Sequence, residues 1–171
     1  MSSYYMEIGP NGVPIWLPPT MLKARFSGNR LITASWAVIV EDSVKSDNIK
    51  LGYLPFPNIY NPSLDSISRV GQICFGTSRL SEMPENPDKG QLISALIDLL
   101  LNSTWNSDYL SATTAYPENM QEKYEDLSDD LKLGSGYANS VGKLHLQLIS
   151  CMRDKQTCSE LKWKQFPQER L

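Results

Sequence analysis

The sequence has few of the residues that metal sites and disulfide frameworks need. Its 171 residues include one histidine and three cysteines. A single imidazole excludes a histidine-rich zinc site, and three unevenly spaced thiols do not make a paired disulfide framework. We therefore expect no metal and no cofactor. We also expect Cys74, Cys151 and Cys158 to be reduced thiols of a cytoplasmic protein.

Long apolar runs and basic clusters are also lacking. No stretch approaches the roughly 20 apolar residues that span a bilayer. Residues 1–20 hold four prolines where a signal peptide needs a continuous apolar run. The 16 Lys and Arg are outnumbered by 19 Asp and Glu, so the net charge is −3. Because phosphate backbones are bound by clustered Lys and Arg, the sequence predicts neither a nucleic-acid nor a membrane partner.

What the sequence does have is the composition of an ordinary globular protein. Hydrophobic residues make up 41% and charged residues 20%. A chain of this length can bury a stable core without metal or disulfide support. We therefore predict a single domain over residues 1–171.

The predicted elements place strands before helices. Residues with strand propensity fill five segments: 4–8, 13–17, 21–26, 31–40 and 48–54. Three later segments are predicted helices: 91–101, which is leucine-rich and follows Asp88 as its N-cap; 117–131, which is strongly charged; and 141–152, which is amphipathic. This order predicts an α+β fold, an antiparallel β-meander with helices packed on one face.

A carboxamide and a thiol define the candidate site. Pro57-Asn58-Ile59-Tyr60 precedes Gly71-Gln72-Ile73-Cys74, which puts Asn58 and Cys74 on neighbouring pieces of extended chain. A thiolate that attacks a carbonyl needs a donor to stabilise the oxyanion, so Cys74 is a candidate nucleophile and Asn58 a candidate donor. An inert, buried Cys74 fits the same pattern, since most lone cysteines are structural. His145 lies between two leucines of a predicted helix, and this position favours a structural role for it.

These residues carry a family resemblance. Ubiquitin-conjugating enzymes have a His-Pro-Asn motif followed by Gly-x-Ile-Cys, and residues 57–60 and 71–75 are similar to it. Residues 93–101 are similar to the leucine-rich helix that follows the cysteine in that family. The chain resembles in particular a divergent bacterial branch, prokaryotic ubiquitin-conjugating-like family D, which includes PRTRC system protein B. Two departures are that Phe56 replaces the motif histidine and that the interval from Asn58 to Cys74 is longer.

The resemblance implies a fold, a site and partners. The ubiquitin-conjugating (UBC)-like core would cover about residues 20–155, between a proline-rich N-terminal extension and a short C-terminal tail. Cys74 would carry a ubiquitin-like modifier as a thioester, and Asn58 would support the oxyanion. The partners would be proteins, namely the modifier and an activating enzyme.

Two other hypotheses remain open. The chain could be a catalytically inactive interaction or assembly subunit of a plasmid, phage or defence complex. Its Trp163–Phe166 tail would then dock against a neighbour, although the tail could equally cover its own core. A weaker hypothesis is a redox sensor using Cys151 and Cys158. That requires a helix to end between them, because residues seven apart on one helix are too distant for a disulfide.

Overall fold

The computed structural model describes residues 3–28, 30–41, 49–56, 58–60, 70–75, 86–102, 113–122, 124–131 and 140–166. Its elements, in chain order, are β1 (Tyr4–Ile8), β2 (Val13–Leu17), β3 (Thr20–Ser27), β4 (Arg30–Glu41), β5 (Lys50–Gly52), β6 (Ile59–Tyr60), β7 (Gln72–Ile73), α1 (Lys89–Asn102), the 3-10 helix η1 (Thr113–Ala115), α2 (Ser140–Met152) and α3 (Lys155–Glu160). Strands precede helices and all strand pairs are antiparallel, so the predicted α+β class is confirmed.

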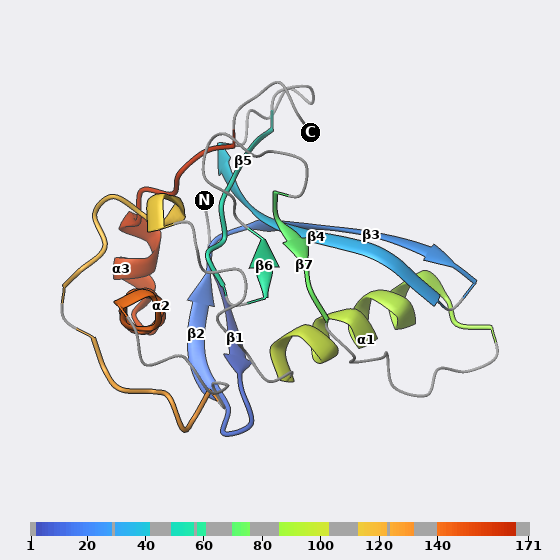
Figure 1. Cartoon of the computed structure of the whole chain (residues 1–171), viewed down its shortest axis with the longest axis horizontal. Coiled ribbons are helices and arrows are strands. Elements are labelled where there is room, and N and C mark those ends of the chain that lie inside the picture. The colour runs from blue at the N-terminus through green and yellow to red at the C-terminus, as the bar shows by residue number, and fades with distance from the viewer. Residues whose placement is uncertain are drawn as a thin grey trace.

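The described strands form two sheets and not one continuous meander. β1 and β2 pair with each other, and the larger sheet has the order β3-β4-β7-β6 with β5 also on β4 (Figure 1). Pro18 and Pro19 separate β2 from β3. Proline has no backbone N–H to donate to a strand ladder, which explains why the chain changes sheets there.

The long β3–β4 hairpin forms the arm on the right of Figure 1. Its register runs from Thr20 opposite Val38 to Ser27 opposite Arg30, with a bulge after Arg25. Residues directly opposite each other share a face, and Leu22 lies opposite the buried Trp36. The inner end of β4 therefore enters the core, and β7 pairs with β4 at Ser35.

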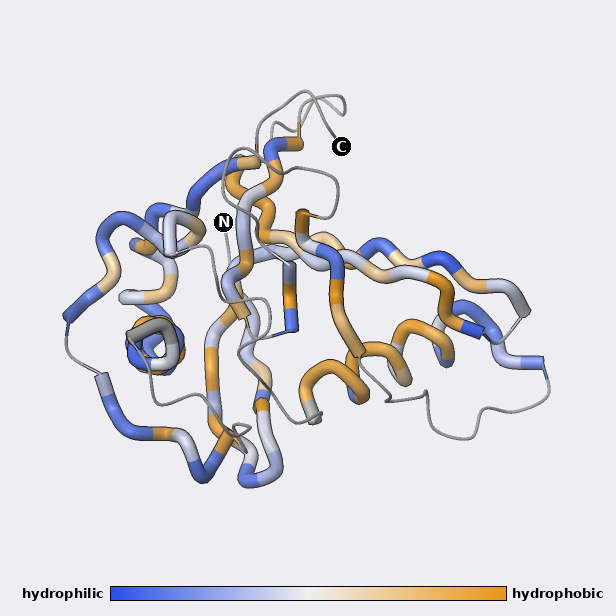
Figure 2. Tube along the Cα trace, viewed as in Figure 1, coloured by the Kyte–Doolittle hydropathy of each residue, from blue (hydrophilic) through white to orange (hydrophobic). Residues whose placement is uncertain are grey.

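The helix α1 begins with a capping box. The Asp88 carboxylate accepts from the Gln91 backbone N–H at 2.8 Å, and the Gln91 side chain accepts from the Asp88 N–H at 2.9 Å. This confirms Asp88 as the N-cap. Figure 2 shows α1 as a hydrophobic element, and its buried leucines are Leu92, Leu96, Leu100 and Leu101.

The prediction of a helix over residues 117–131 is wrong. Residues 117–122 and 124–131 form turns and extended chain. A charged segment with few apolar residues cannot bury a helix face, and most helix stability in proteins comes from such burial. Its polar groups bond to the C-terminal helices instead. The Glu125 N–H donates to Ser150 Oγ at 2.9 Å, and the Asn119 carboxamide donates to the Glu160 carbonyl at 2.8 Å.

The segment after α3 returns to the larger sheet. The Tyr53 N–H donates to the Lys164 carbonyl at 2.9 Å, and the Phe166 N–H donates to the Leu51 carbonyl at 2.8 Å. The Phe166 ring is buried, and its centroid lies 4.8 Å from that of Tyr53. We call residues 161–166 the C-terminal strap. Of the two roles left open for Trp163–Phe166, the contacts of Phe166 favour covering the protein's own core.

Candidate functional site

The short β6–β7 pair brings Asn58 and Cys74 together. Ile59 lies opposite Ile73 and Tyr60 opposite Gln72, so Asn58 and Cys74 occupy the next position of the same register. The Cys74 N–H donates to the Asn58 carbonyl at 2.7 Å. The two residues are neighbours across the pair, as their spacing predicts. Their catalytic roles stay predictions.

Asn58 also has a backbone role of its own. Its φ is +65°, in the left-handed region that asparagine tolerates better than most residues. The Ile59 N–H donates to the Phe56 carbonyl at 3.2 Å, which closes a tight turn around Asn58. Asn58 is buried at 6% exposure. Turn geometry therefore accounts for an asparagine here independently of any chemistry.

The three cysteines differ in exposure. Cys74 is partly exposed, whereas Cys151 and Cys158 are each only 1% exposed. Burial raises the pKa of Cys151, and it raises the pKa of Cys158 to about 12. The Cys158 thiol also donates to the Trp16 carbonyl at 2.9 Å. Since the thiolate is the nucleophile, Cys74 is the thiol best placed to react.

The strand β7, which ends one residue before Cys74, depends on a close approach to β4. The Trp36 N–H donates to the Gly71 carbonyl at 2.8 Å. A Cβ on Gly71 would lie 2.9 Å from the Trp36 carbonyl oxygen, and the φ of Gly71 is +72°. Both observations explain why glycine begins the Gly-x-Ile-Cys sequence. Gly76, Pro57, Arg69 and Arg79, which also surround the motif, lie outside the described residues.

The wall behind the site is made of Phe56, Trp36 and His145. Phe56 is 1% exposed, and its ring meets those of Trp36 and His145 edge-on, each with centroids 5.8 Å apart. His145 Nδ1–H donates to the Pro55 carbonyl at 3.3 Å. Burial lowers the pKa of His145 to about 3, although the bond to Pro55 opposes that shift. A buried, neutral imidazole bonded to the backbone fits the structural role predicted for His145.

No sequence pattern predicts this wall. Phe56 is next to the motif, but Trp36 and His145 come from β4 and from α2, far away along the chain. Only the fold reveals that the single histidine packs on the segment leading to Asn58. Phe56 is therefore a residue of the hydrophobic core.

The helix break that a Cys151–Cys158 disulfide would need is present. α2 ends at Met152 and α3 begins at Lys155, with Asp154 as its N-cap. Both thiols are free and buried. Their burial and raised pKa values leave little thiolate for disulfide exchange at neutral pH, so the redox-sensor hypothesis gains no support.

Two features are absent from the described residues. No cluster of His, Cys, Asp and Glu in them could hold a metal ion. None of their helices is long and apolar enough to cross a membrane. Comparison of the chain with known protein families, curated proteins and solved structures gives no match.

Proposed function

We propose that this chain is a divergent, cytoplasmic ubiquitin-conjugating-like protein with a UBC-like fold that carries a ubiquitin-like modifier as a thioester on Cys74. The observation that carries the proposal is the pairing of Asn58 with Cys74, whose backbones are joined by a 2.7 Å hydrogen bond. The partial exposure of Cys74 supports it, since a carrier thiol must be reached by large partners. The element order adds support. The strands β1 to β5 come first, the β6–β7 pair beside Cys74 follows, and the leucine-rich helix α1 comes next, as the resemblance implies.

The proposed chemistry is two acyl transfers. The Cys74 thiolate attacks the thioester carbonyl that joins the modifier to an activating enzyme. A new C–S bond forms, and the cysteine of the activating enzyme leaves as a thiolate. An acceptor amine then attacks the carbonyl on Cys74, a C–N bond forms, Cys74 leaves as a thiolate and the amine releases one proton. The Asn58 carboxamide donates to the oxyanion in both steps.

Intact mass spectrometry of the chain from its native cells, purified under acidic non-reducing conditions, tests the carrier role. We expect a mass increment that dithiothreitol removes and that Cys74→Ala abolishes. Cys74→Ser should retain the modifier as an ester that dithiothreitol does not cleave, because a hydroxyl replaces the thiol. Cys158→Ser is the matched control and should keep the labile adduct. An adduct that persists in folded Cys74→Ala overturns the proposal.

The proposed role of Asn58 needs a variant that leaves its turn intact. Asn58→Gly keeps the left-handed backbone accessible and removes the carboxamide, whereas Asn58→Ala also strains the backbone. Losing an oxyanion donor typically slows transfer by about 10²–10³-fold. We expect that loss in Asn58→Gly, and a cooperative melting transition shows that the variant is folded. Normal transfer in that variant would assign Asn58 to the turn alone.

A non-catalytic interaction or assembly subunit of a plasmid, phage or defence complex is the second candidate. It is favoured by the burial of Phe56 in place of the motif histidine and by the turn role of Asn58, which together explain the motif without chemistry. Cys74→Ala would then co-purify with the same partners as the unmodified chain and carry no adduct in either form. Light scattering adds a separate check, since a stable monomer disfavours an obligate assembly subunit.

A further inference from the structure

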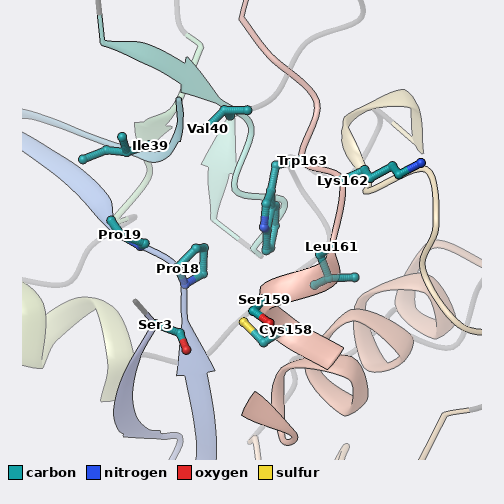
Figure 3. Close-up of a pocket in the computed structure, with 10 residues that line it drawn as sticks. All are labelled: Ser3, Pro18, Pro19, Ile39, Val40, Cys158, Ser159, Leu161, Lys162 and Trp163. Atoms are coloured by element: carbon teal, nitrogen blue, oxygen red, sulfur yellow. The ribbon is translucent and has the colours of Figure 1, made fainter. Parts of the chain in front are cut away.

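The β3–β4 hairpin has a strand edge that the described structure leaves open. β3 is the outermost strand of the larger sheet, and β4 is its only strand partner in the part of the chain that the structure describes. Figure 3 shows Pro19 and Ile39, at the inner end of this ladder, beside the pocket between the β2–β3 junction and the C-terminal strap. The Ile39 N–H donates to the Pro19 carbonyl at 2.8 Å, so this first position of the ladder is hydrogen-bonded.

The register then fixes which backbone groups of β3 face outward. In an antiparallel pair, hydrogen-bonded and non-hydrogen-bonded positions alternate. Because the first position is hydrogen-bonded, Thr20, Leu22 and Ala24 hold non-hydrogen-bonded positions. Their backbone N–H and C=O groups therefore point away from β4, toward the open edge. The Trp36 N–H, which lies opposite Leu22, donates to Gly71 on the far side of β4, as this alternation requires.

The same hairpin is basic on one face. Lys23, Arg25 and Arg30 are the only charged residues between positions 20 and 40, and all three are exposed. Lys23 and Arg25 lie two apart on β3 and so share a face, and the register puts Arg30 on that face too, opposite Ser27. None of the three makes an ion pair within the described part of the chain. This face is therefore a local concentration of positive charge in a chain whose net charge is −3.

The opposite face of β3 is apolar. Leu22 and Ala24 pack against the main hydrophobic core and are only partly buried. A strand added at the open edge points its side chains alternately to the two faces. One set lies beside Lys23 and Arg25, and the other set extends the apolar face beside Leu22 and Ala24. The edge therefore favours a strand in which acidic and apolar residues alternate.

The charges disfavour a second copy of this chain as the added strand. The antiparallel registers that pair most of β3 with another β3 place Lys23 of one copy opposite Lys23 or Arg25 of the other. Like charges directly opposite each other destabilise a strand pair, and basic residues on an edge are a common protection against self-pairing. The occupant that these charges fit is an acidic one.

We propose that the open edge of β3 binds an extended segment of an acidic protein, in which Asp or Glu alternates with apolar residues, as an added antiparallel strand. Backbone hydrogen bonds supply the pairing, and the two faces of β3 select the side chains. Antiparallel addition matches every strand pair described in this protein and is the more stable pairing per residue. β7 lies on the other side of β4, so this inference is independent of the thioester proposal.

Fluorescence anisotropy of labelled seven-residue peptides with the full chain tests the charge requirement. We expect 1:1 binding of Val-Glu-Val-Glu-Val-Glu-Val and at least about tenfold weaker binding of the analogue with lysine in place of glutamate. Lys23→Glu/Arg25→Glu should weaken binding of the glutamate peptide at least about fivefold and strengthen binding of the lysine peptide. Lys89→Glu/Lys143→Glu makes the same change in net charge at exposed helical positions and should change either affinity by less than about twofold at physiological salt. Cooperative melting transitions show that both double variants are folded.

N-methylated peptides test the strand geometry. In an antiparallel pair, the residue directly opposite Leu22 or Ala24 shares its face and exchanges backbone hydrogen bonds with it. The valine N–H groups therefore point to β3, and the glutamate N–H groups point to solvent. We expect N-methylation of the two inner valines to abolish binding, and N-methylation of two glutamates to preserve it.

Four results would overturn the proposal. They are no binding of the glutamate peptide, equal effects of the two N-methylations, charge reversal on β3 that leaves the peptide preference unchanged, and displacement of the peptide by an eight-nucleotide single-stranded RNA. A dimer of the unmodified chain that the peptide dissociates would likewise overturn it, because a second copy would then occupy the edge.

Discussion

At the scale of single residues, the three cysteines give a direct experimental contrast. Cys74 is partly exposed, and the other two thiols are buried with raised pKa values. Exposure and thiolate content both control thiol reactivity. Exposure thus distinguishes Cys74, the candidate site, from Cys151 and Cys158, which are buried structural residues.

We predict that Ellman's reagent titrates one thiol of the native protein rapidly. Cys151 and Cys158 should react on the order of 100-fold more slowly, since the chain must open before the reagent reaches them. Denaturant should release all three at once. The Cys74→Ala variant should lose only the fast phase. Two fast thiols in the native protein would contradict the burial of Cys151 and Cys158.

Gly71 offers a second test at this scale. Gly71→Ala strains a backbone at φ +72° and puts a methyl group 2.9 Å from the Trp36 carbonyl oxygen. Gly28 is a matched control, because its φ is +58° and nothing lies within 4 Å of the added methyl group. We expect Gly28→Ala to lower the free energy of unfolding by about 1–2 kcal/mol from strain. Gly71→Ala should cost about 1–3 kcal/mol more, from overpacking.

Chemical denaturation of both variants measures the difference. Equal losses would mean that β4 does not approach Gly71 as closely as described.

At the scale of elements, sequence patterns located the helices that bury an apolar face. The predicted segments 91–101 and 141–152 match α1 and α2 within two residues at each end. The prediction of a helix over the charged segment 117–131 was wrong because a helix there would have no apolar face to bury, and backbone and side-chain groups of the segment bond to α2 and α3 instead. Local propensity cannot report bonds to partners that lie tens of residues away.

The capping box of α1 predicts a measurable contribution. Asp88→Ala leaves the Gln91 N–H without its 2.8 Å acceptor, so we expect a loss of about 1 kcal/mol in the free energy of unfolding. Asp88→Ser should recover most of that loss, because serine is also a good N-cap residue. Urea denaturation compares the two variants. A loss in Asp88→Ser as large as that in Asp88→Ala would show that the cap contributes little.

At the scale of the whole molecule, the sequence could predict neighbours along the chain better than contacts between distant segments. The spacing of Asn58 and Cys74 predicted their pairing because a short antiparallel pair brings together residues on either side of one loop. The wall of Phe56, Trp36 and His145 depends on how α2 packs against the sheet. The C-terminal strap is likewise a tertiary feature that no local pattern encodes.

The free energy of unfolding should decrease as the pH is lowered, because His145 is buried in its neutral form. Its pKa is about 3 in the folded protein and near 6.5 when exposed, so the unfolded chain binds one more proton between these values. The contribution of His145 to the free energy of unfolding should therefore be fully present above pH 6.5. Well below that pH it should decrease by about 1.4 kcal/mol per pH unit. The useful window is pH 6.5–4.5. Glu118, Asp126 and Asp154 have lowered pKa values, and their effects begin in more acidic solution.

Denaturation across that window in His145→Gln checks the assignment. The variant should lose the slope between pH 6.5 and 4.5, even if its stability is lower throughout. An unchanged slope would assign the acid sensitivity to other groups.

The C-terminal strap should contribute strongly to global stability. Phe166 is buried against Tyr53, and Phe166→Ala should lower the free energy of unfolding by about 3 kcal/mol or more. Tyr124→Ala removes an aromatic ring that is 38% exposed and should cost far less. Thermal melts compare the two variants. Similar melting temperatures would contradict the docking of Phe166.

The strap also has a consequence for the order in which the protein can mature during its synthesis. The backbone of β5 and the ring of Tyr53 receive their cover from residues 164–166. A nascent chain that has made β1 to α3 but has not yet released residues 164–166 from the ribosome still presents an open strand edge. Such edges are prone to pairing with other chains. Residues 164–166 must therefore leave the ribosome before that edge is protected.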